Sequence, residues 1–130
     1  MEIKSLCPLL QVFDMKTSLN FYCDVLGFTI HQSAGSTDDL GWVWLKRGSI
    51  DLMLNTAYET PDRPANPDPL RNAAHADTAI YFGLPDVEKM YDYLKSKGFA
   101  SEPPQIAPYG MKQLYLKDPD GYTICFQWAV

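Results

Sequence analysis

Apolar side chains recur at helical spacing in two stretches of the chain, one between Asp14 and Gly27 and one between Asp86 and Gly98. In each stretch they occupy positions i, i+3 and i+7, the spacing that brings side chains to one face of an α-helix. The residues concerned are Leu19, Tyr22, Leu26, Val87, Met90 and Leu94. An aspartate accepts the free N–H groups of a first helical turn, and glycine adopts the left-handed conformation that ends a helix. The pattern therefore predicts two capped helices.

Strand-like segments follow each predicted helix, and each pair is joined by a turn signal. The strands are expected at residues 42–46, 50–54, 111–117 and 122–128. The second pair is joined by Asp-Pro-Asp-Gly, in which proline presets φ and glycine supplies a positive φ. With an extended segment before each helix, each half of the chain is expected to fold as β-α-β-β-β. The sequence therefore contains an internal repeat of one β-α-β-β-β unit.

A proline-rich stretch separates the two halves. We expect one domain over residues 1–130, with module one at about 1–56, a linker at about 57–76 and module two at about 77–130. The four prolines of the linker predict an extended segment with few hydrogen bonds. Two interpretations remain open for it: a solvated connection, or a lid over a site.

The alternation of side chains along the predicted strands divides each sheet into two faces. Successive side chains point to opposite sides of a strand, so one face collects aliphatic residues and the other a mixed set. The first face is expected to pack under the helices, and it holds Val43, Leu45, Ile50, Leu52, Leu54, Leu114, Leu116, Ile124 and the aromatic residues Phe126 and Trp128. The opposite faces are aromatic and polar, and every site prediction below depends on this parity.

Composition and charge exclude several classes of function. The chain has 130 residues and a net charge of −5, and its lysines and arginines do not cluster, so we expect no binding to nucleic acid or to anionic membranes. We find neither a signal peptide nor an apolar run of about 18 residues. Three cysteines with no Cys-x-x-Cys pair favour a reducing compartment, and we expect a cytoplasmic protein.

A duplicated βαβββ module that carries VxD…FYxxxLGF early and DPDGY late resembles the glyoxalase / bleomycin-resistance / extradiol dioxygenase superfamily, also called the vicinal oxygen chelate proteins. The resemblance covers essentially the whole chain. It implies an α+β fold in which two βαβββ modules form a cup-like open barrel with the helices outside. It also implies a homodimer.

The resemblance implies that the mixed faces line the cup and bind a small molecule. There, aromatic rings stack on a flat or apolar ligand, amides orient it, and a carboxylate attracts positive charge. The predicted ligand-binding residues are Trp42, Trp44, Asp51, Asn55, Tyr81, Gln113, Tyr115 and Gln127, with Gln11 as a further amide. An alternative is that these aromatic residues fill the barrel or the dimer interface.

Metal-dependent members of this superfamily place a ligand, usually His, Glu or Gln, on the first and last strand of each module. The equivalent positions here are Cys7, Asp51, Ala79 and Cys125. Alanine cannot bind a metal, and no position holds His or Glu. A zinc site from the two cysteines and Asp51 is chemically conceivable. We nevertheless predict no metal and no other cofactor.

The leading hypothesis is therefore a metal-free protein, similar to the bleomycin-resistance branch, that sequesters an aromatic or cationic small molecule. A divalent-metal-dependent lyase, isomerase or dioxygenase of the same superfamily is the first alternative. A metal-free enzyme with Asp51 as its general base is the second.

Overall fold

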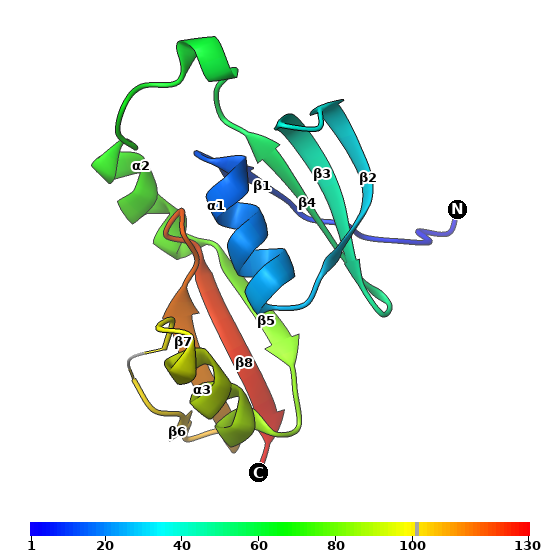
Figure 1. Cartoon of the computed structure of the whole chain (residues 1–130). Coiled ribbons are helices and arrows are strands. Elements are labelled where there is room, and N and C mark those ends of the chain that lie inside the picture. Colours follow the sequence, from blue (N-terminus) through cyan, green and yellow to red (C-terminus); the bar gives the residue numbers. More distant parts are fainter. Residues whose placement is uncertain (101) are drawn as a thin grey trace. The chain divides into compact units, whose positions relative to one another are not determined.

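A computed structural model describes residues 1–100 and 102–130 of the chain. The chain divides into two compact units, Met1–Pro67 and Asp68–Val130, and each contains one four-stranded sheet (Figure 1). The two sheets have the same plan, as the sequence repeat predicts, so the fold is α+β and consists of two βαβββ modules.

In the first unit the sheet has the order β1-β4-β3-β2, in which β1 and β4 run parallel and the other pairs antiparallel. A helical segment connects β1 to β2. The elements are β1 (Leu9–Val12), α1 (Met15–Leu19), η1 (Asn20–Val25), β2 (Thr29–Ser36), β3 (Asp39–Arg47), β4 (Ile50–Thr56) and η2 (Thr60–Asp62).

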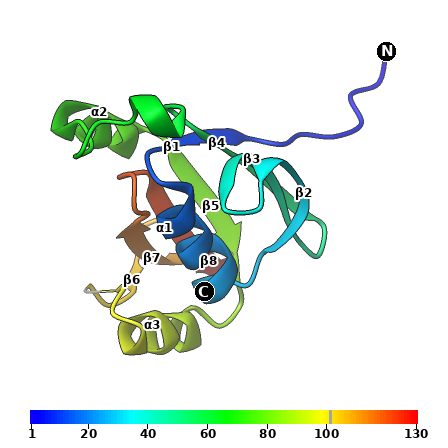
Figure 2. The ribbon, with the colours of Figure 1, turned by 45° about the horizontal axis from the view of Figure 1, so that its top comes forward.

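The second unit repeats this plan with the order β5-β8-β7-β6, and β5 is parallel to β8. Its helix α3 lies along one side of the sheet, as Figure 2 shows. The elements are α2 (Pro69–Ala74), η3 (His75–Asp77), β5 (Ala79–Gly83), α3 (Val87–Ser96), β6 (Gln105–Ile106), β7 (Met111–Lys117) and β8 (Thr123–Ala129).

Both predicted helix caps are confirmed. The Asp14 side chain accepts a hydrogen bond from the backbone N–H of Lys16 at 3.1 Å, and that of Asp86 accepts one from Lys89 at 3.0 Å. Gly27 closes the first helical segment with φ 79°. The second half of that segment, η1, differs from a regular α-helix because its bonds span five residues, as from Leu26 N–H to the Phe21 carbonyl at 2.9 Å.

The predicted parity of the strands is confirmed by burial. In the first unit β3 and β4 place their aliphatic residues under the helical segment, which adds Phe21 and Tyr22 to the core. The buried aliphatic positions are Val43, Leu45, Leu52, Leu54, Leu114, Leu116 and Ile124. Ile50 and Trp128 depart from the prediction, with exposed fractions of 42% and 47%, because they lie at or next to the ends of their strands.

The prediction of an extended linker is wrong for part of the segment. α2 begins after Asp68, whose side chain accepts a hydrogen bond from the backbone N–H of Leu70 at 3.0 Å. Pro69 occupies the first helical position, where its missing N–H costs no hydrogen bond. The same proline that suggested extended structure therefore starts a helix.

The Asp-Pro-Asp-Gly turn anchors the end of this helical segment. Asp118 is buried, and its carboxylate accepts hydrogen bonds from the backbone N–H groups of Asp120 and Tyr122 at 2.8 and 2.9 Å. His75 stacks on the Tyr122 ring at 4.1 Å and donates from Nδ1 to the Asp120 carbonyl at 2.8 Å. The turn is thus a structural joint between β7, β8 and η3.

Candidate functional site

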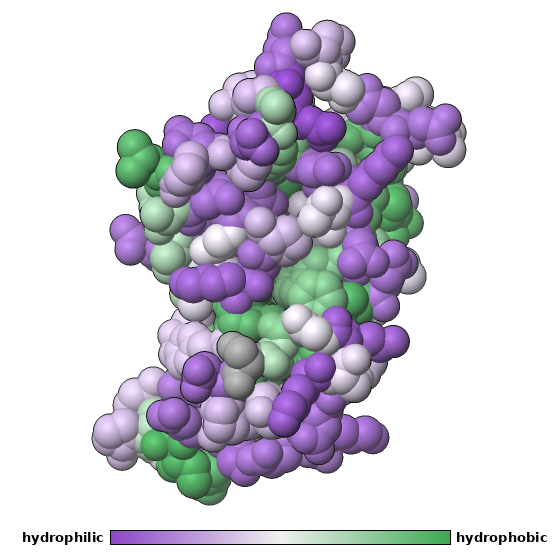
Figure 3. All heavy atoms as spheres, turned by 60° about the vertical axis from the view of Figure 1, so that its left-hand side comes forward, coloured by the Kyte–Doolittle hydropathy of each residue, from purple (hydrophilic) through white to green (hydrophobic). Residues whose placement is uncertain are grey.

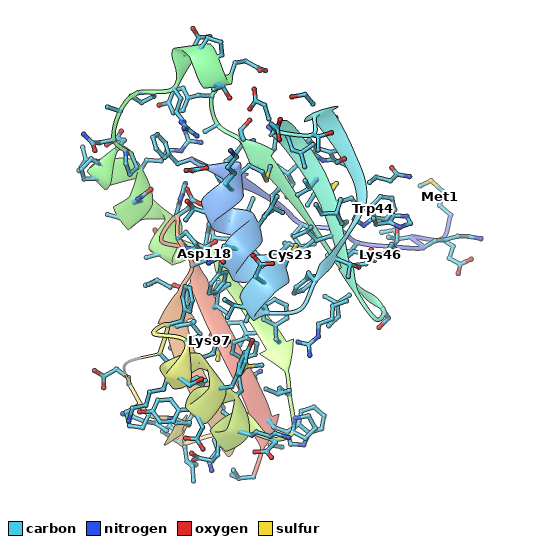
Figure 4. All side chains as sticks on the ribbon, viewed as in Figure 1. Met1, Cys23, Trp44, Lys46, Lys97 and Asp118 are labelled. Carbon is cyan, nitrogen blue, oxygen red and sulfur yellow. The ribbon has the colours of Figure 1, made fainter. Side chains whose placement is uncertain are left out.

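Each sheet has one face turned away from the helix of its own unit, and we call it the open face. On the first unit it carries Trp42, Trp44, Lys46, Asp51 and Asn55, all of them partly exposed. Trp44 and Lys46 lie on the side of β3 away from α1 (Figure 4). The open face of the second unit carries Tyr81, Gln113, Tyr115, Cys125 and Gln127. The structure therefore distributes the eight predicted ligand-binding residues over two open faces, four on each.

Trp44 and Asp51 are joined on the first open face. The indole Nε1 of Trp44 donates a hydrogen bond of 2.8 Å to Asp51 Oδ1. The same oxygen lies 3.0 Å from Lys46 Nζ, because Lys46 and Asp51 are direct cross-strand partners. The Lys46 ammonium also lies over the indole ring, 4.8 Å from its centroid. One carboxylate and one ammonium group thus fix the orientation of an aromatic ring.

His31 joins this cluster through an irregularity that the sequence does not reveal. Ile30 pairs with Leu45, but Gln32 pairs with Trp44, so β2 contains one extra residue at this point. In such a bulge two residues lie opposite one residue of the neighbouring strand. The His31 ring meets the Trp44 ring edge to face, with 4.7 Å between the centroids.

The pairing of Asp51 has a chemical consequence. Hydrogen bonds from Lys46 and from Trp44 stabilise its ionised form and hold the pKa of the Asp51 carboxyl below its ordinary value of 3.8. The charge of the carboxylate is already partly balanced by Lys46. Asp51 is consequently a weak base, and its attraction for a cation is reduced.

The remaining predicted residues of the first open face form a polar edge. Trp42 and Asn55 are cross-strand partners on β3 and β4, and Asn55 is also paired in register with Gln11 of β1. The Asn55 amide nitrogen lies 3.5 Å from Gln11 Oε1 and 3.3 Å from the Thr56 carbonyl oxygen. The Asn55 amide therefore comes from the position opposite Trp42 on the neighbouring strand, and the Gln11 amide from the next strand along.

The second open face carries two hydrogen-bonded groups. The hydroxyls of Tyr81 and Tyr115 are 2.9 Å apart, and their rings meet edge to face at 6.2 Å. Gln113 Nε2 donates to Gln127 Oε1 at 2.9 Å. The hydroxyl of Tyr109, a residue that the sequence did not suggest, donates to Gln113 Oε1 at 3.1 Å. Its position after the short strand β6 gives no periodic signal.

Tyr115 and Cys125 are direct cross-strand partners on this face. The hydrogen bond with Tyr81 raises the pKa of the Tyr115 hydroxyl above its ordinary range, and burial of the hydroxyl adds to the shift. Burial likewise raises the pKa of the Cys125 thiol. Both groups are therefore neutral near pH 7, and the second open face offers uncharged hydrogen-bonding groups around its aromatic rings.

The four positions equivalent to metal ligands do not form a donor set that fits a divalent ion. Ala79 has no donor atom, and Asp51 is the only carboxylate among the four positions. Hard divalent ions such as Mg²⁺ prefer oxygen ligands, and these positions supply a single charged oxygen group. Within residues 1–100 and 102–130, no three His, Cys, Asp or Glu side chains are grouped as a metal site requires.

None of the helices in the described part of the chain has the length and apolar character needed to cross a bilayer.

In each unit the chain runs from a first strand through a helical segment to three more strands, and the last strand pairs in parallel with the first. This order defines the class as a duplicated βαβββ protein. A family model described as the Glyoxalase/Bleomycin resistance protein/Dioxygenase superfamily matches residues 5–126. The chain belongs to this superfamily.

The chain is similar to proteins from several sources. It is 30% identical over 122 residues to the uncharacterized protein YaeR of Escherichia coli K12, with 85% of this chain and 84% of that protein covered. A bleomycin resistance determinant encoded on transposon Tn5 has a TM-score of 0.71, 23% identity and 98% coverage of both chains. TnmS3, an antibiotic binding protein from Streptomyces sp. CB03234, has a TM-score of 0.72 and 20% identity, with 100% of this chain and 99% of that chain covered. At these identities the two structures show a shared fold.

Proposed function

We propose that the chain is a small-molecule binding protein that sequesters an aromatic or cationic ligand on its open faces without a metal. The observation that carries this proposal is the fixed orientation of Trp44. Its ring has one edge hydrogen-bonded to Asp51 and is contacted by Lys46 and His31. A ring held in this way loses little further freedom when a flat ligand stacks on it, and low ordering cost favours affinity.

The chemistry of both open faces supports stacking more strongly than ionic attraction. Trp42 and Trp44 provide π surface on the first face, and Tyr81 and Tyr115 provide it on the second. Asn55, Gln113 and Gln127 supply the few polar groups that orient a ligand in a largely apolar site. Because Lys46 already balances Asp51, positive charge on the ligand is expected to add less affinity than aromatic area.

The structural neighbours support the same class of function. Two of them are a bleomycin resistance determinant and an antibiotic binding protein. Both share the fold over nearly the full length of this chain. Binding a bulky organic molecule is therefore compatible with this arrangement of strands and helices, although one fold supports many functions.

The two enzymatic alternatives receive less support from the residues present. A divalent-metal-dependent lyase, isomerase or dioxygenase needs a donor set that the positions of Cys7, Asp51, Ala79 and Cys125 do not supply. A metal-free enzyme needs a base whose pKa lies near the working pH, and the hydrogen bonds to Asp51 lower its pKa instead. We therefore place neither ahead of stoichiometric binding.

We further propose that the protein is a homodimer in the cytoplasm. The superfamily resemblance supports the dimer. The three cysteines, which are all free, support a reducing compartment.

Three probes test the proposed function: 9-aminoacridine, which is planar and cationic, acridone, which is planar and neutral, and bleomycin. Binding is measured from the fluorescence anisotropy of the two dyes and from displacement of a dye by bleomycin. We expect the purified protein to bind at least one acridine, and Trp44→Ala to weaken that binding about tenfold or more.

Trp128→Ala is the matched control, because Trp128 lies on the opposite side of its sheet from the open-face residues. It is expected to leave the affinity unchanged. Equal affinities of the Trp44→Ala variant and the unmodified protein would contradict the proposed site. Failure of all three probes to bind would contradict the proposed ligand class.

A further inference from the structure

A cavity of about 300 Å³ lies in the first unit, separate from its open face. It is formed where β1 and β4 end, beside the turn between β2 and β3. Apolar surface comes from Phe13, Leu19, Leu40 and Tyr58. None of the residues proposed above for ligand binding contributes to its lining. The cavity is therefore distinct from the proposed binding surface and has a composition of its own.

The cavity already contains a cationic group, and it belongs to the chain itself. The guanidinium carbon of Arg63 lies 5.5 Å from the centroid of the Phe13 ring. One of its nitrogens, Nη1, lies 3.6 Å from Asp14 Oδ1. The arrangement combines an aromatic face with a carboxylate, which is how proteins bind guanidinium and ammonium groups.

The contacts of Arg63 are loose. At 3.6 Å the nitrogen and oxygen form an ion pair but not a good hydrogen bond, and the side chains of Arg63 and Asp14 are 35% and 38% exposed. Exposed ion pairs of this kind contribute little stability. Asp14 is held independently, because its Oδ1 also caps the helix through the backbone N–H of Lys16. Arg63 can therefore leave while the carboxylate stays in place.

The segment that carries Arg63 forms one wall of the cavity. Tyr58 meets the Phe13 ring edge to face at 6.4 Å, and the Thr60 hydroxyl donates to Asp39 Oδ1 at 2.6 Å. The outer surface over residues 57–67, at the top of Figure 3, is mainly hydrophilic. These two contacts hold the wall without Arg63, so removal of its side chain is not expected to open the cavity.

We propose that this cavity binds a small molecule with an amidinium, guanidinium or ammonium group on an apolar body, and that Arg63 is an internal occupant that the ligand displaces. Without Arg63, the charged residues that line the cavity are Asp14, Asp38, Asp39 and Lys16, three acidic and one basic. Asp38 has no hydrogen bond or ion pair among residues 1–100 and 102–130. The cavity therefore selects positive charge, and its rings accept the apolar body.

Three probes of nearly the same shape test the sign of the charge: benzamidine is cationic, benzamide neutral and benzoate anionic. Binding is followed by ¹H–¹⁵N chemical shifts of the full chain, which report both affinity and location. We expect benzamidine to bind most tightly and to shift the signals of residues 13–16, 37–40 and 58–63. Shifts confined to the open-face strands would overturn this proposal without affecting the one made for the open face.

Substitution of Arg63 gives the sharper test, because the two possible roles of this residue predict opposite signs. If Arg63 competes with the ligand, Arg63→Ala tightens benzamidine binding, and we expect at least about a threefold effect. If Arg63 instead recruits an anion, the same variant loses benzoate binding and gains none for benzamidine. That second result would overturn the proposal.

Two variants control for a general change of charge. Lys16→Ala removes a positive charge from the same cavity without exposing the Phe13 ring, and Arg71→Ala removes one from α2. The gain for Arg63→Ala is expected to exceed the gain for Lys16→Ala, and Arg71→Ala is expected to change nothing. Equal gains in affinity for all three variants would mean that the effect comes from the net charge of the protein, and would overturn the role of Arg63.

Asp38→Asn is expected to weaken benzamidine binding about threefold.

Discussion

Trp44 and Asp51 are bound to each other across the turn that joins β3 to β4, through a hydrogen bond of 2.8 Å from the indole Nε1 to Oδ1. The strand register brings Lys46 directly opposite Asp51, so a single carboxylate oxygen has two donors. The carboxylate is consequently an orienting group for the ring. Its role in binding is expected to be indirect, through the position of Trp44.

The pairing of Asp51 makes stability depend on pH. Its pKa in the folded protein lies below 3.8, so the pairing stabilises the fold fully above that value and is lost as the pH falls through the lower, folded pKa. We expect Asp51→Asn to lower the Tm at about pH 7, and the difference from the unmodified protein to shrink at about pH 2. Thermal unfolding followed by circular dichroism at both pH values measures this effect.

Asp92→Asn is a suitable control for that experiment. Asp92 is exposed on α3 and has no ion pair or side-chain hydrogen bond within the described part of the chain. Its substitution is expected to leave the Tm nearly unchanged at about pH 7. A difference for Asp51→Asn that persisted or grew at low pH would contradict stabilisation through the ionised carboxylate.

Metal content tests the proposed absence of a cofactor. We expect the purified protein, after incubation with Zn²⁺, Ni²⁺, Mn²⁺ or Fe²⁺ and removal of free ions, to hold far less than one ion per chain. The reason is the mismatch between the thiols, the single carboxylate and Ala79 at the positions equivalent to ligands. Elemental mass spectrometry gives the answer directly. Near-stoichiometric metal that disappears in Asp51→Ala would restore the metal-dependent alternative.

The geometry of the Asp-Pro-Asp-Gly turn can be tested at Gly121, which has φ 87°. A Cβ added there would collide with the backbone carbonyl of Asn72 in α2. Gly110 has a similar φ of 81°, but a Cβ there would have no neighbour within 4 Å. We expect Gly110→Ala to lower the free energy of unfolding by about 1 kcal/mol and Gly121→Ala by about 3 kcal/mol or more. Urea denaturation measures both free energies of unfolding. Equal losses for the two variants would mean that the positive φ, and not the collision with Asn72, causes the destabilisation.

The three free cysteines are expected to differ in reactivity. Cys125 is fully buried, whereas Cys7 and Cys23 are partly exposed. Burial raises the pKa of Cys23 to about 11, so only a small fraction is thiolate at about pH 8. We expect iodoacetamide to modify Cys7 first and Cys125 last, as measured by peptide mass spectrometry. Modification of Cys125 at the rate of Cys7 in the folded protein would contradict its burial.

Much of the fold could be predicted from local signals. The caps at Asp14 and Asp86 and the alternation of Val43 with Trp44 depend on neighbours in the sequence, and the structure confirms them. α2 was missed because Pro69 is compatible with both an extended chain and a first helical turn. The choice between them is made by the Asp68 cap.

The interactions of the candidate site were less accessible to sequence analysis. Parity placed Trp44 and Asp51 on one face, but not in contact, because contact depends on register and rotamers. The bulge at His31 shifts the pairing of β2 by one residue, and alternation alone carries no sign of it. The position of Arg63 over Phe13 arises from a segment without periodicity, where no pattern was available to read.

The division of β3 into two faces has a consequence for how such a protein can diverge. Val43 and Leu45 have no exposed surface and secure the fold, while Trp42 and Trp44 on the same strand do not belong to the core. Under the proposed function, substitutions at Trp42 and Trp44 therefore change which molecule is bound at little cost in folding. Descendants of a single ancestral gene can acquire new ligands in this way while they keep one architecture.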